Sequence, residues 1–156
     1  MSFVFAMPRW LCLLSLLLGV RSNTPEVTTP IGQLRGSSDG RDGEVHVFLG
    51  IPYAEAPVGD LRWRPPRRVK PWKGLREASS FGNQCKNHCM SGSHLDFSTK
   101  GGDEDCLYLN VYAPKEAHNT SQLPCLVFLH GGCNEFGAGH ESGLSNPVFS
   151  SAPFLV

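Results

Sequence analysis

The sequence lacks a charge excess of either sign, internal repeats, and any long apolar run after its first 22 residues. Fourteen Lys and Arg balance fourteen Asp and Glu, so net charge gives no reason to expect a nucleic-acid or membrane-surface partner. No later stretch approaches the roughly eighteen apolar residues that a membrane-spanning helix needs. Glycine (17) and proline (12) are abundant instead, which favours turns and extended segments over long helices.

Residues 1–22 have the pattern of a secretory signal peptide. Arg9 is the only charged residue before an apolar stretch at residues 10–20, which is too short to span a bilayer. A membrane anchor is the alternative, and the length disfavours it. We therefore predict a mature chain of residues 23–156 that is secreted or retained in the endoplasmic reticulum lumen, without a membrane span.

Export would place the cysteines in an oxidising compartment. Cys12 leaves with the signal peptide, and five cysteines remain, so at least one pair is expected to be bridged. Cys125 lies inside an apolar run and is expected to be a buried free thiol that behaves as a small hydrophobic residue. Cys89 and Cys133 have no obvious partner.

The sequence also carries one N-glycosylation sequon, Asn119-Thr120-Ser121. It falls in the connector between two strand-like segments, where a surface loop is expected. Such a tripeptide is an acceptor only in an exported protein. We therefore predict glycosylation at Asn119 as a consequence of the signal peptide.

Two strand-like segments surround this connector. Residues 107–112 alternate apolar and polar side chains and stop at Pro114. Residues 125–129 form an unbroken apolar run, as expected for a strand covered on both faces. This run leads into His130-Gly131-Gly132, where glycines let the backbone turn sharply and bring N–H groups close to a ligand. Such a loop can hold the oxyanion of an acyl-transfer intermediate.

The part of the chain before these segments is predicted to be strand and turn. Residues 27–34 carry β-branched side chains, residues 37–43 form a turn cluster, and residues 44–49 alternate. The two strand segments can form one antiparallel ribbon. Residues 75–80 are the only short helix candidate here, and residues 85–102 are polar and read as a loop.

The segment EDCLYLNVYAP at residues 104–114 resembles the signature of the type-B carboxylesterase/lipase family. The similarity continues upstream through FLGIPYA at residues 48–54 and Leu-Arg-Trp at residues 61–63. It covers most of the chain from about residue 29 to residue 139. The family contains carboxylesterases, cholinesterases and bile-salt lipase, and also neuroligin-like members without esterase activity.

The resemblance implies an α/β fold, as an N-terminal fragment of an α/β-hydrolase domain with an antiparallel edge ribbon and the first core strands. That fold needs parallel strands joined by helical crossovers, and no clear crossover helix is present. We therefore expect the chain to be incomplete on its own: a fragment, a truncated gene model or a short splice form. The family also implies a disulfide between Cys85 and Cys106, which contributes about 3 kcal/mol in the chain-entropy model.

In the resembled family, an aromatic or histidine residue precedes three glycines whose backbone N–H groups bind the oxyanion. Gly131 and Gly132 match the first two glycines, and Cys133 stands at the third position. A cysteine still offers its backbone N–H, but its Cβ disfavours a positive φ. We predict that Gly131, Gly132 and Cys133 form the oxyanion loop, with a bend that differs from that of three glycines.

A catalytic nucleophile is not recognisable in these residues. Ser38 is central in the Gly-x-Ser-x-Gly match at residues 36–40, but it lies in a turn cluster far upstream of the oxyanion loop. A nucleophile elbow requires a strand-to-helix turn. Ser142 sits in a faint echo of the elbow, without a preceding strand. We reject both serines and expect no catalytic residue in this chain.

Two metal readings are weaker than their structural alternatives. Cys85, His88, Cys89 and His94 have ragged spacing for zinc, and a secreted disulfide explains Cys85 better. The acidic residues 103–105 lack the alternate spacing of a calcium loop. We expect neither a metal nor a cofactor.

Residues 61–76 hold seven Lys or Arg, no acidic residue, and both Trp63 and Trp72. Such a run can bind heparin or another polyanion. The alternative is a solvated, Pro-rich segment whose arginines pair with nearby acids, and the family match favours this alternative.

Two hypotheses for function follow. The first is the N-terminal part of a secreted serine-type carboxylic ester hydrolase, acting in its full-length form on a small ester and inactive as this chain. The second is a non-catalytic adhesion or binding member of the same family, which Cys133 favours. No Trp lies between Cys85 and Cys106, so choline recognition by cation–π contact is unsupported. The sequence leaves the substrate and the oligomeric state open.

Overall fold

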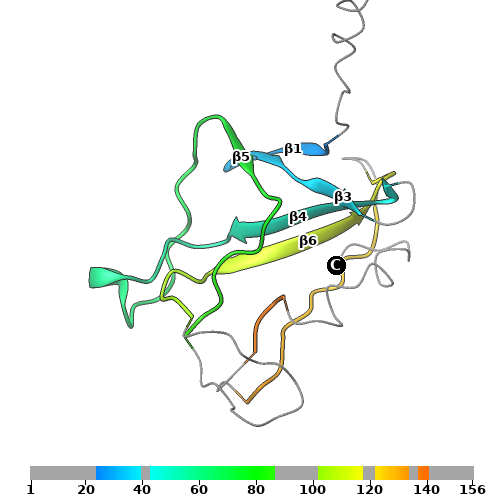
Figure 1. Ribbon diagram of the computed structural model, residues 1–156. Helices are drawn as coiled ribbons and strands as arrows, with labels where there is room; N and C mark the ends of the chain where they lie inside the picture. Colours follow the sequence, from blue (N-terminus) through cyan, green and yellow to red (C-terminus); the bar gives the residue numbers. More distant parts are fainter. Residues whose placement is uncertain (1–23, 40–42, 87–101, 118–121, 134–136, 141–156) are drawn as a thin grey trace, which may run out of the picture.

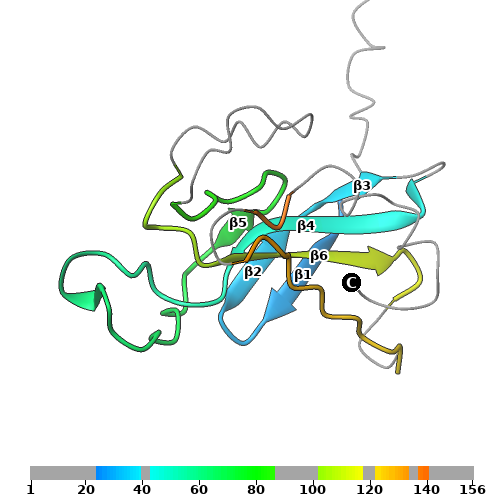
Figure 2. The ribbon, with the colours of Figure 1, turned by 90° about the horizontal axis from the view of Figure 1, so that it is seen from below.

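The computed structural model describes residues 24–39, 43–86, 102–117, 122–133 and 137–140. Within these ranges the chain forms six short strands and one 3-10 turn, arranged as two three-stranded sheets (Figures 1 and 2). The elements are β1 (Glu26–Thr29), β2 (Gly32–Arg35), β3 (Ser37–Asp39), β4 (Val45–Pro52), η3 (Gly59–Leu61), β5 (Leu75–Glu77) and β6 (Tyr108–Pro114). No helix among the described residues is long and apolar enough to cross a bilayer.

The first sheet has the strand order β1-β2-β5. β1 and β2 form an antiparallel hairpin, and β5 runs parallel to β2. The helix predicted at residues 75–80 is therefore wrong, because residues 75–77 are strand β5. Pairing with β2 supplies the backbone bonds that a helix would make, and Ala78 N–H extends the pairing to the Arg35 carbonyl at 2.7 Å. Tertiary pairing overrides a weak local preference here.

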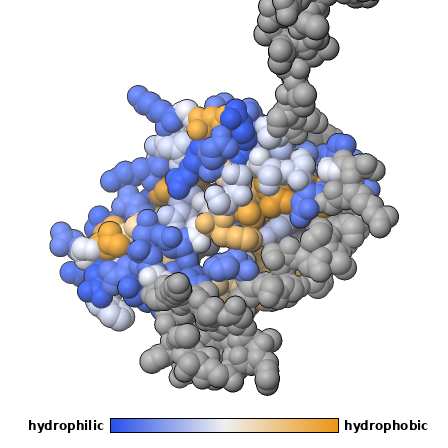
Figure 3. All heavy atoms as spheres, viewed as in Figure 1, coloured by the Kyte–Doolittle hydropathy of each residue, from blue (hydrophilic) through white to orange (hydrophobic). Residues whose placement is uncertain are grey.

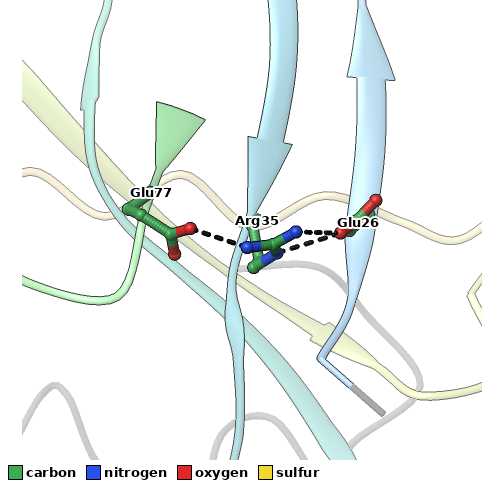
Figure 4. A network of polar contacts seen from close by, with 3 residues as sticks. All are labelled: Glu26, Arg35 and Glu77. Atoms are coloured by element: carbon green, nitrogen blue, oxygen red, sulfur yellow. Dashed lines mark hydrogen bonds and ion pairs between the residues drawn. The ribbon is translucent and has the colours of Figure 1, made fainter. Parts of the chain in front are cut away.

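One arginine joins the three strands of this sheet, as Figure 4 shows. Arg35 lies in register between Glu26 on β1 and Glu77 on β5. Its guanidinium donates to the Glu26 carboxylate at 2.9 Å and to the Glu77 carboxylate at 3.0 Å. The hydrogen bond to Glu26 raises the pKa of Arg35 above its ordinary value. These ion pairs are exposed to solvent, so they add little stability. Their main effect is to fix the register of the three strands.

The second sheet has the order β3-β4-β6 and is antiparallel throughout. The single ribbon predicted from residues 27–34 and 44–49 is wrong, because these segments belong to different sheets. β4 pairs instead with β6, sixty residues later, with a register shift between Phe48 and Ile51. Gly50 lies within this shift at φ 64°. The predicted strand at residues 107–112 is confirmed as β6, which ends at Pro114.

The hydrophobic core lies where the two sheets meet. Leu34 from β2, Phe48 from β4 and Ala78 after β5 are buried together. Partly buried apolar side chains pack around them, namely Val27, Ile51, Trp72 and Val111. The Leu49 N–H donates to the Ala78 carbonyl at 2.8 Å and links the sheets through the backbone. This small core joins the two sheets, and the candidate site lies next to the second of them.

The apolar run at residues 125–129 does not form the predicted buried strand. Val127 is 75 % exposed and Leu129 is 84 % exposed, and no named strand covers this segment. Cys125 is likewise an exposed free thiol, so the prediction of a buried thiol is wrong. A strand covered on both faces needs neighbours on each side, and the described elements supply none here.

Candidate functional site

The glycine-rich loop at residues 130–133 turns through two consecutive residues with left-handed backbone. Gly132 has φ 109° and Cys133 has φ 55°. The cysteine thus adopts a conformation that its Cβ disfavours, by about 1–2 kcal/mol. Its thiol is exposed and unpaired. A turn of this kind changes the direction of the backbone between successive N–H groups.

The chain returns against this loop at residues 137–140. A Cβ at Gly137 would lie 2.5 Å from His130 Nδ1 and 2.7 Å from the Gly131 carbonyl oxygen. Gly137 has φ 111°, so both space and backbone geometry require glycine. Ala138 beside it is buried. The return segment therefore packs directly on the first half of the loop.

Asn110 on β6 ties the return segment to the second sheet. The Gly50 N–H donates to Asn110 Oδ1 at 3.0 Å, and Asn110 Nδ2 donates to the Gly139 carbonyl at 3.2 Å. The His140 ring stacks obliquely on Phe81, with ring centroids 5.3 Å apart. The sequence-based reasoning missed Asn110 and Gly137. A polar residue inside a strand and a glycine just after the loop were the only available signals.

Replacing Asn110 by alanine is expected to destabilise the chain by about 1–3 kcal/mol, because it leaves the Gly50 N–H without an acceptor. Asn110→Asp provides the matched control. It keeps the oxygen that accepts from Gly50 and removes the donor to Gly139, so only the return segment should loosen. Amide hydrogen exchange at Gly50 reports the first bond directly. Gly139 contributes its carbonyl to the second bond, so the exchange of its amide reports the local order of the return segment. Equal exchange of Gly139 in all three proteins would contradict this role of Asn110.

The structure joins Cys85 and Cys106, the pair that the family resemblance implied, with an S–S distance of 2.04 Å. Cys85 is thereby excluded as a zinc ligand, and His88, Cys89 and His94 lie outside the described residues. Within the described ranges, no group of three or more His, Cys, Asp or Glu side chains is arranged to hold a metal ion.

The acidic run at residues 103–105 makes structural contacts. Asp103 Oδ1 accepts from the Asp105 N–H at 2.9 Å, and Asp105 Oδ1 accepts from the Tyr108 hydroxyl at 2.9 Å. Glu104 forms an ion pair with Arg62 at 2.7 Å. These carboxylates hold the approach to β6 in place, so the structural interpretation of the acidic run accounts for all three.

Tyr108 should make the stability of the chain fall at alkaline pH. Burial and the hydrogen bond to Asp105 raise its pKa above the ordinary value of about 10. Its stabilising contribution is therefore complete below pH 10 and is lost as the pH rises through the higher folded-state pKa. Tyr108→Phe should be less stable at neutral pH by about 1 kcal/mol, through the lost hydrogen bond. It should also lose less stability above pH 10 in urea titrations, and an unchanged pH dependence would contradict this assignment.

The remaining candidate residues lie elsewhere. Ser38 is on β3, opposite His46 of β4 in an antiparallel pair. It therefore lacks the strand-to-helix turn of a nucleophile elbow. The predicted signal peptide at residues 1–22, the sequon at Asn119 and Ser142 lie outside the described residues.

Comparison with known proteins identifies the family of this chain. Residues 23–149 match the model of the carboxylesterase family, and the chain belongs to that family. It is 42% identical over 120 residues to an acylcarnitine hydrolase of Rattus norvegicus, covering 70% of this chain and 21% of the relative. It is 39% identical to a medium-chain fatty acyl-CoA hydrolase precursor of Anas platyrhynchos, covering 73% of this chain and 22% of that protein.

Solved esterase structures resemble the chain over most of its length. A PNB esterase matches with a TM-score of 0.71 and 31% identity, covering 85% of this chain and 27% of that structure. A carboxylesterase of Geobacillus stearothermophilus matches with a TM-score of 0.69 and 36% identity, covering 84% and 25%. The chain thus has the strand-rich N-terminal part of an α/β-hydrolase fold. It spans about a quarter of the length of these relatives.

Proposed function

We propose that this chain is the N-terminal part of a secreted or endoplasmic-reticulum-lumenal carboxylic ester hydrolase of the serine esterase type. Family membership across residues 23–149 is the observation that carries the proposal. The left-handed turn at Gly132 and Cys133 supports it, because it suits the binding of an oxyanion. The substrate proposed for the full-length form is a small carboxylic ester.

The proposed role of the loop is electrostatic. Attack on an ester carbonyl moves a negative charge onto the carbonyl oxygen, and preorganised backbone N–H groups stabilise that charge. Gly131, Gly132 and Cys133 are proposed to supply these donors, while Gly137 and Asn110 hold the loop against the sheet. Removal of one such donor typically lowers the rate by about 10²–10³.

We propose that the 156-residue chain does not by itself turn over an ester. Its one Gly-x-Ser-x-Gly match places Ser38 on an antiparallel strand, away from any strand-to-helix turn. An oxyanion loop without a nucleophile leaves at most a residual rate, about 10³–10⁴ over water.

A fluorophosphonate probe tests this inactivity. The purified chain and its Ser38→Ala variant are both expected to remain unlabelled, while a known serine esterase in the same reaction is labelled stoichiometrically. Stoichiometric labelling of the chain would contradict the proposed inactivity, and its loss in Ser38→Ala would identify Ser38 as the nucleophile. Transcript sequencing beyond the Val156 codon tests the enzyme assignment, which requires a Gly-x-Ser-x-Gly elbow downstream of the loop.

A non-catalytic adhesion or binding protein is the second candidate function. The observation that favours it is Cys133, which keeps the left-handed turn at the energetic cost of a side chain in the place of the third glycine. A downstream elbow with a residue other than serine would favour this candidate over the enzyme.

A further inference from the structure

Residues 61–76, which we term the basic segment, contain seven of the fourteen Lys and Arg in the chain and no acid. The sequence favours ion pairing of these cations with nearby acids, and the structure provides it for two of them. Arg62 pairs with Glu104 at 2.7 Å, and Lys70 pairs with Glu55 at 3.3 Å. The other five make no ion pair within the described ranges. Arg76 lies over the Trp72 ring, 5.4 Å from its centroid, which leaves four cations without an ion pair or a ring contact: Arg64, Arg67, Arg68 and Lys73. Most of the charge of the segment is therefore uncompensated.

The basic segment is an extended arm anchored to the fold at fixed points. The Arg67 carbonyl accepts from the Glu55 N–H at 3.0 Å, and the Trp72 N–H donates to the Ile31 carbonyl at 2.9 Å. Pro65 and Pro66 directly precede the first anchor and Pro71 directly precedes the second, and their fixed φ restricts the backbone at these points. Figure 1 shows the loop between η3 and β5 running along the outside of the sheets, and Figure 3 shows hydrophilic residues over that edge. The four unpaired cations are all exposed.

Trp63 adds an apolar platform among these cations. Its side chain is 95 % exposed, and its backbone has φ 59°, one of two positive values outside glycine in the described chain. Two successive turns hold it there, with the Arg62 N–H on the Gly59 carbonyl and the Arg64 N–H on the Leu61 carbonyl, both at 3.2 Å. Strained backbone that presents an exposed aromatic side chain is more typical of a binding site than of a connecting loop.

We propose that the basic segment is a binding surface for a sulfated polysaccharide. Closely spaced, uncompensated cations attract a polyanion. The exposed indole provides a flat surface for a sugar ring. The choice of partner rests on the export proposed above, because nucleic acids and the anionic lipids of the cytoplasmic leaflet are absent from that compartment. An extended, anchored arm suits a linear polymer, since little backbone freedom is lost on binding.

Binding to immobilised heparin at about 50–200 mM salt tests the proposal. Arg64→Gln/Arg68→Gln is expected to weaken binding about tenfold at low salt and to reduce the slope of log affinity on log salt by about 1.5–2. Lys86→Gln/Lys115→Gln is the matched control, because it removes two exposed cations outside the segment. It should change affinity by less than about threefold. Equal weakening by the two double variants would overturn the proposal.

Trp63 provides an independent readout. The mature chain contains only Trp63 and Trp72, so heparin should reduce acrylamide quenching in the wild type and leave Trp63→Phe unaffected. Equal binding of desulfated heparin would overturn the proposal. Tighter binding of a single-stranded oligonucleotide or of phosphatidylserine vesicles would also overturn it. Esterase activity enters none of these readouts, and recovery of the chain from the culture medium tests export separately.

Discussion

Replacing Phe48 by alanine is expected to lower the free energy of unfolding by about 3–5 kcal/mol. Phe48 is 8 % exposed and belongs to the cluster with Leu34 and Ala78 that joins the two sheets. Its ring also packs on the backbone of Gly36, where an added Cβ would lie 2.8 Å from the ring. Alanine would leave a cavity that such close contacts cannot fill by small shifts. Urea titration followed by circular dichroism measures the loss.

Phe128→Ala is the matched control for this prediction. Phe128 is 48 % exposed and lies in the apolar run at residues 125–129, outside any named strand. The same truncation there should change stability by less than about 0.5 kcal/mol, as for most surface substitutions. Equal losses in the two variants would contradict the exposed arrangement of this run.

Removal of the disulfide is expected to cost about 3 kcal/mol. Cys85 and Cys106 are 21 positions apart in the sequence, so the bridge restricts the unfolded chain over a loop of moderate length. It also holds the turn that leads into β6, where the Asp103 N–H donates to the Gln84 carbonyl at 2.9 Å. The double variant Cys85→Ser/Cys106→Ser avoids leaving one thiol that can form a new pair. Urea titration of the double variant gives the size of the loss.

Two comparisons isolate the bridge itself. A reducing agent should destabilise the wild type to the level of the double variant and leave the double variant unchanged. Cys125→Ser removes an exposed free thiol and should have almost no effect on stability. A double variant as stable as the wild type would show that the bridge adds nothing to the fold.

The elements that the sequence predicted correctly are those with a strong local signal. β6 combines alternation with a terminating Pro114, and β4 contains an alternating run of apolar residues. The pairing of these strands was not predictable, because register depends on contacts between segments sixty residues apart. The helix predicted at β5 is wrong, because three residues carry too little periodicity to reveal a strand that forms only by pairing with β2. Apolar composition alone also failed at residues 125–129, where burial requires neighbouring strands.

In the candidate site, too, the sequence predicted features that have a local signal and missed those that depend on contacts formed by the fold. The turn after His130 was predicted from two glycines. The sequence argued against a positive φ at Cys133, because a Cβ disfavours it, but the structure has φ 55° there. Asn110 and Gly137 were missed, because each matters only through a partner that is distant in sequence or brought close by the fold. Ion pairing within the basic segment likewise depends on the folded structure. The sequence gives the number of Lys and Arg residues in the segment, but only the folded structure shows which of them form ion pairs with a carboxylate.

The exposed apolar side chains at positions 126–129 should affect the solubility of the chain. Water around such side chains is released whenever two molecules meet there, and this driving force weakens on cooling. Solutions of the chain should therefore turn cloudy on warming at high concentration and clear again when chilled or diluted. Light scattering during a temperature ramp would follow this behaviour directly.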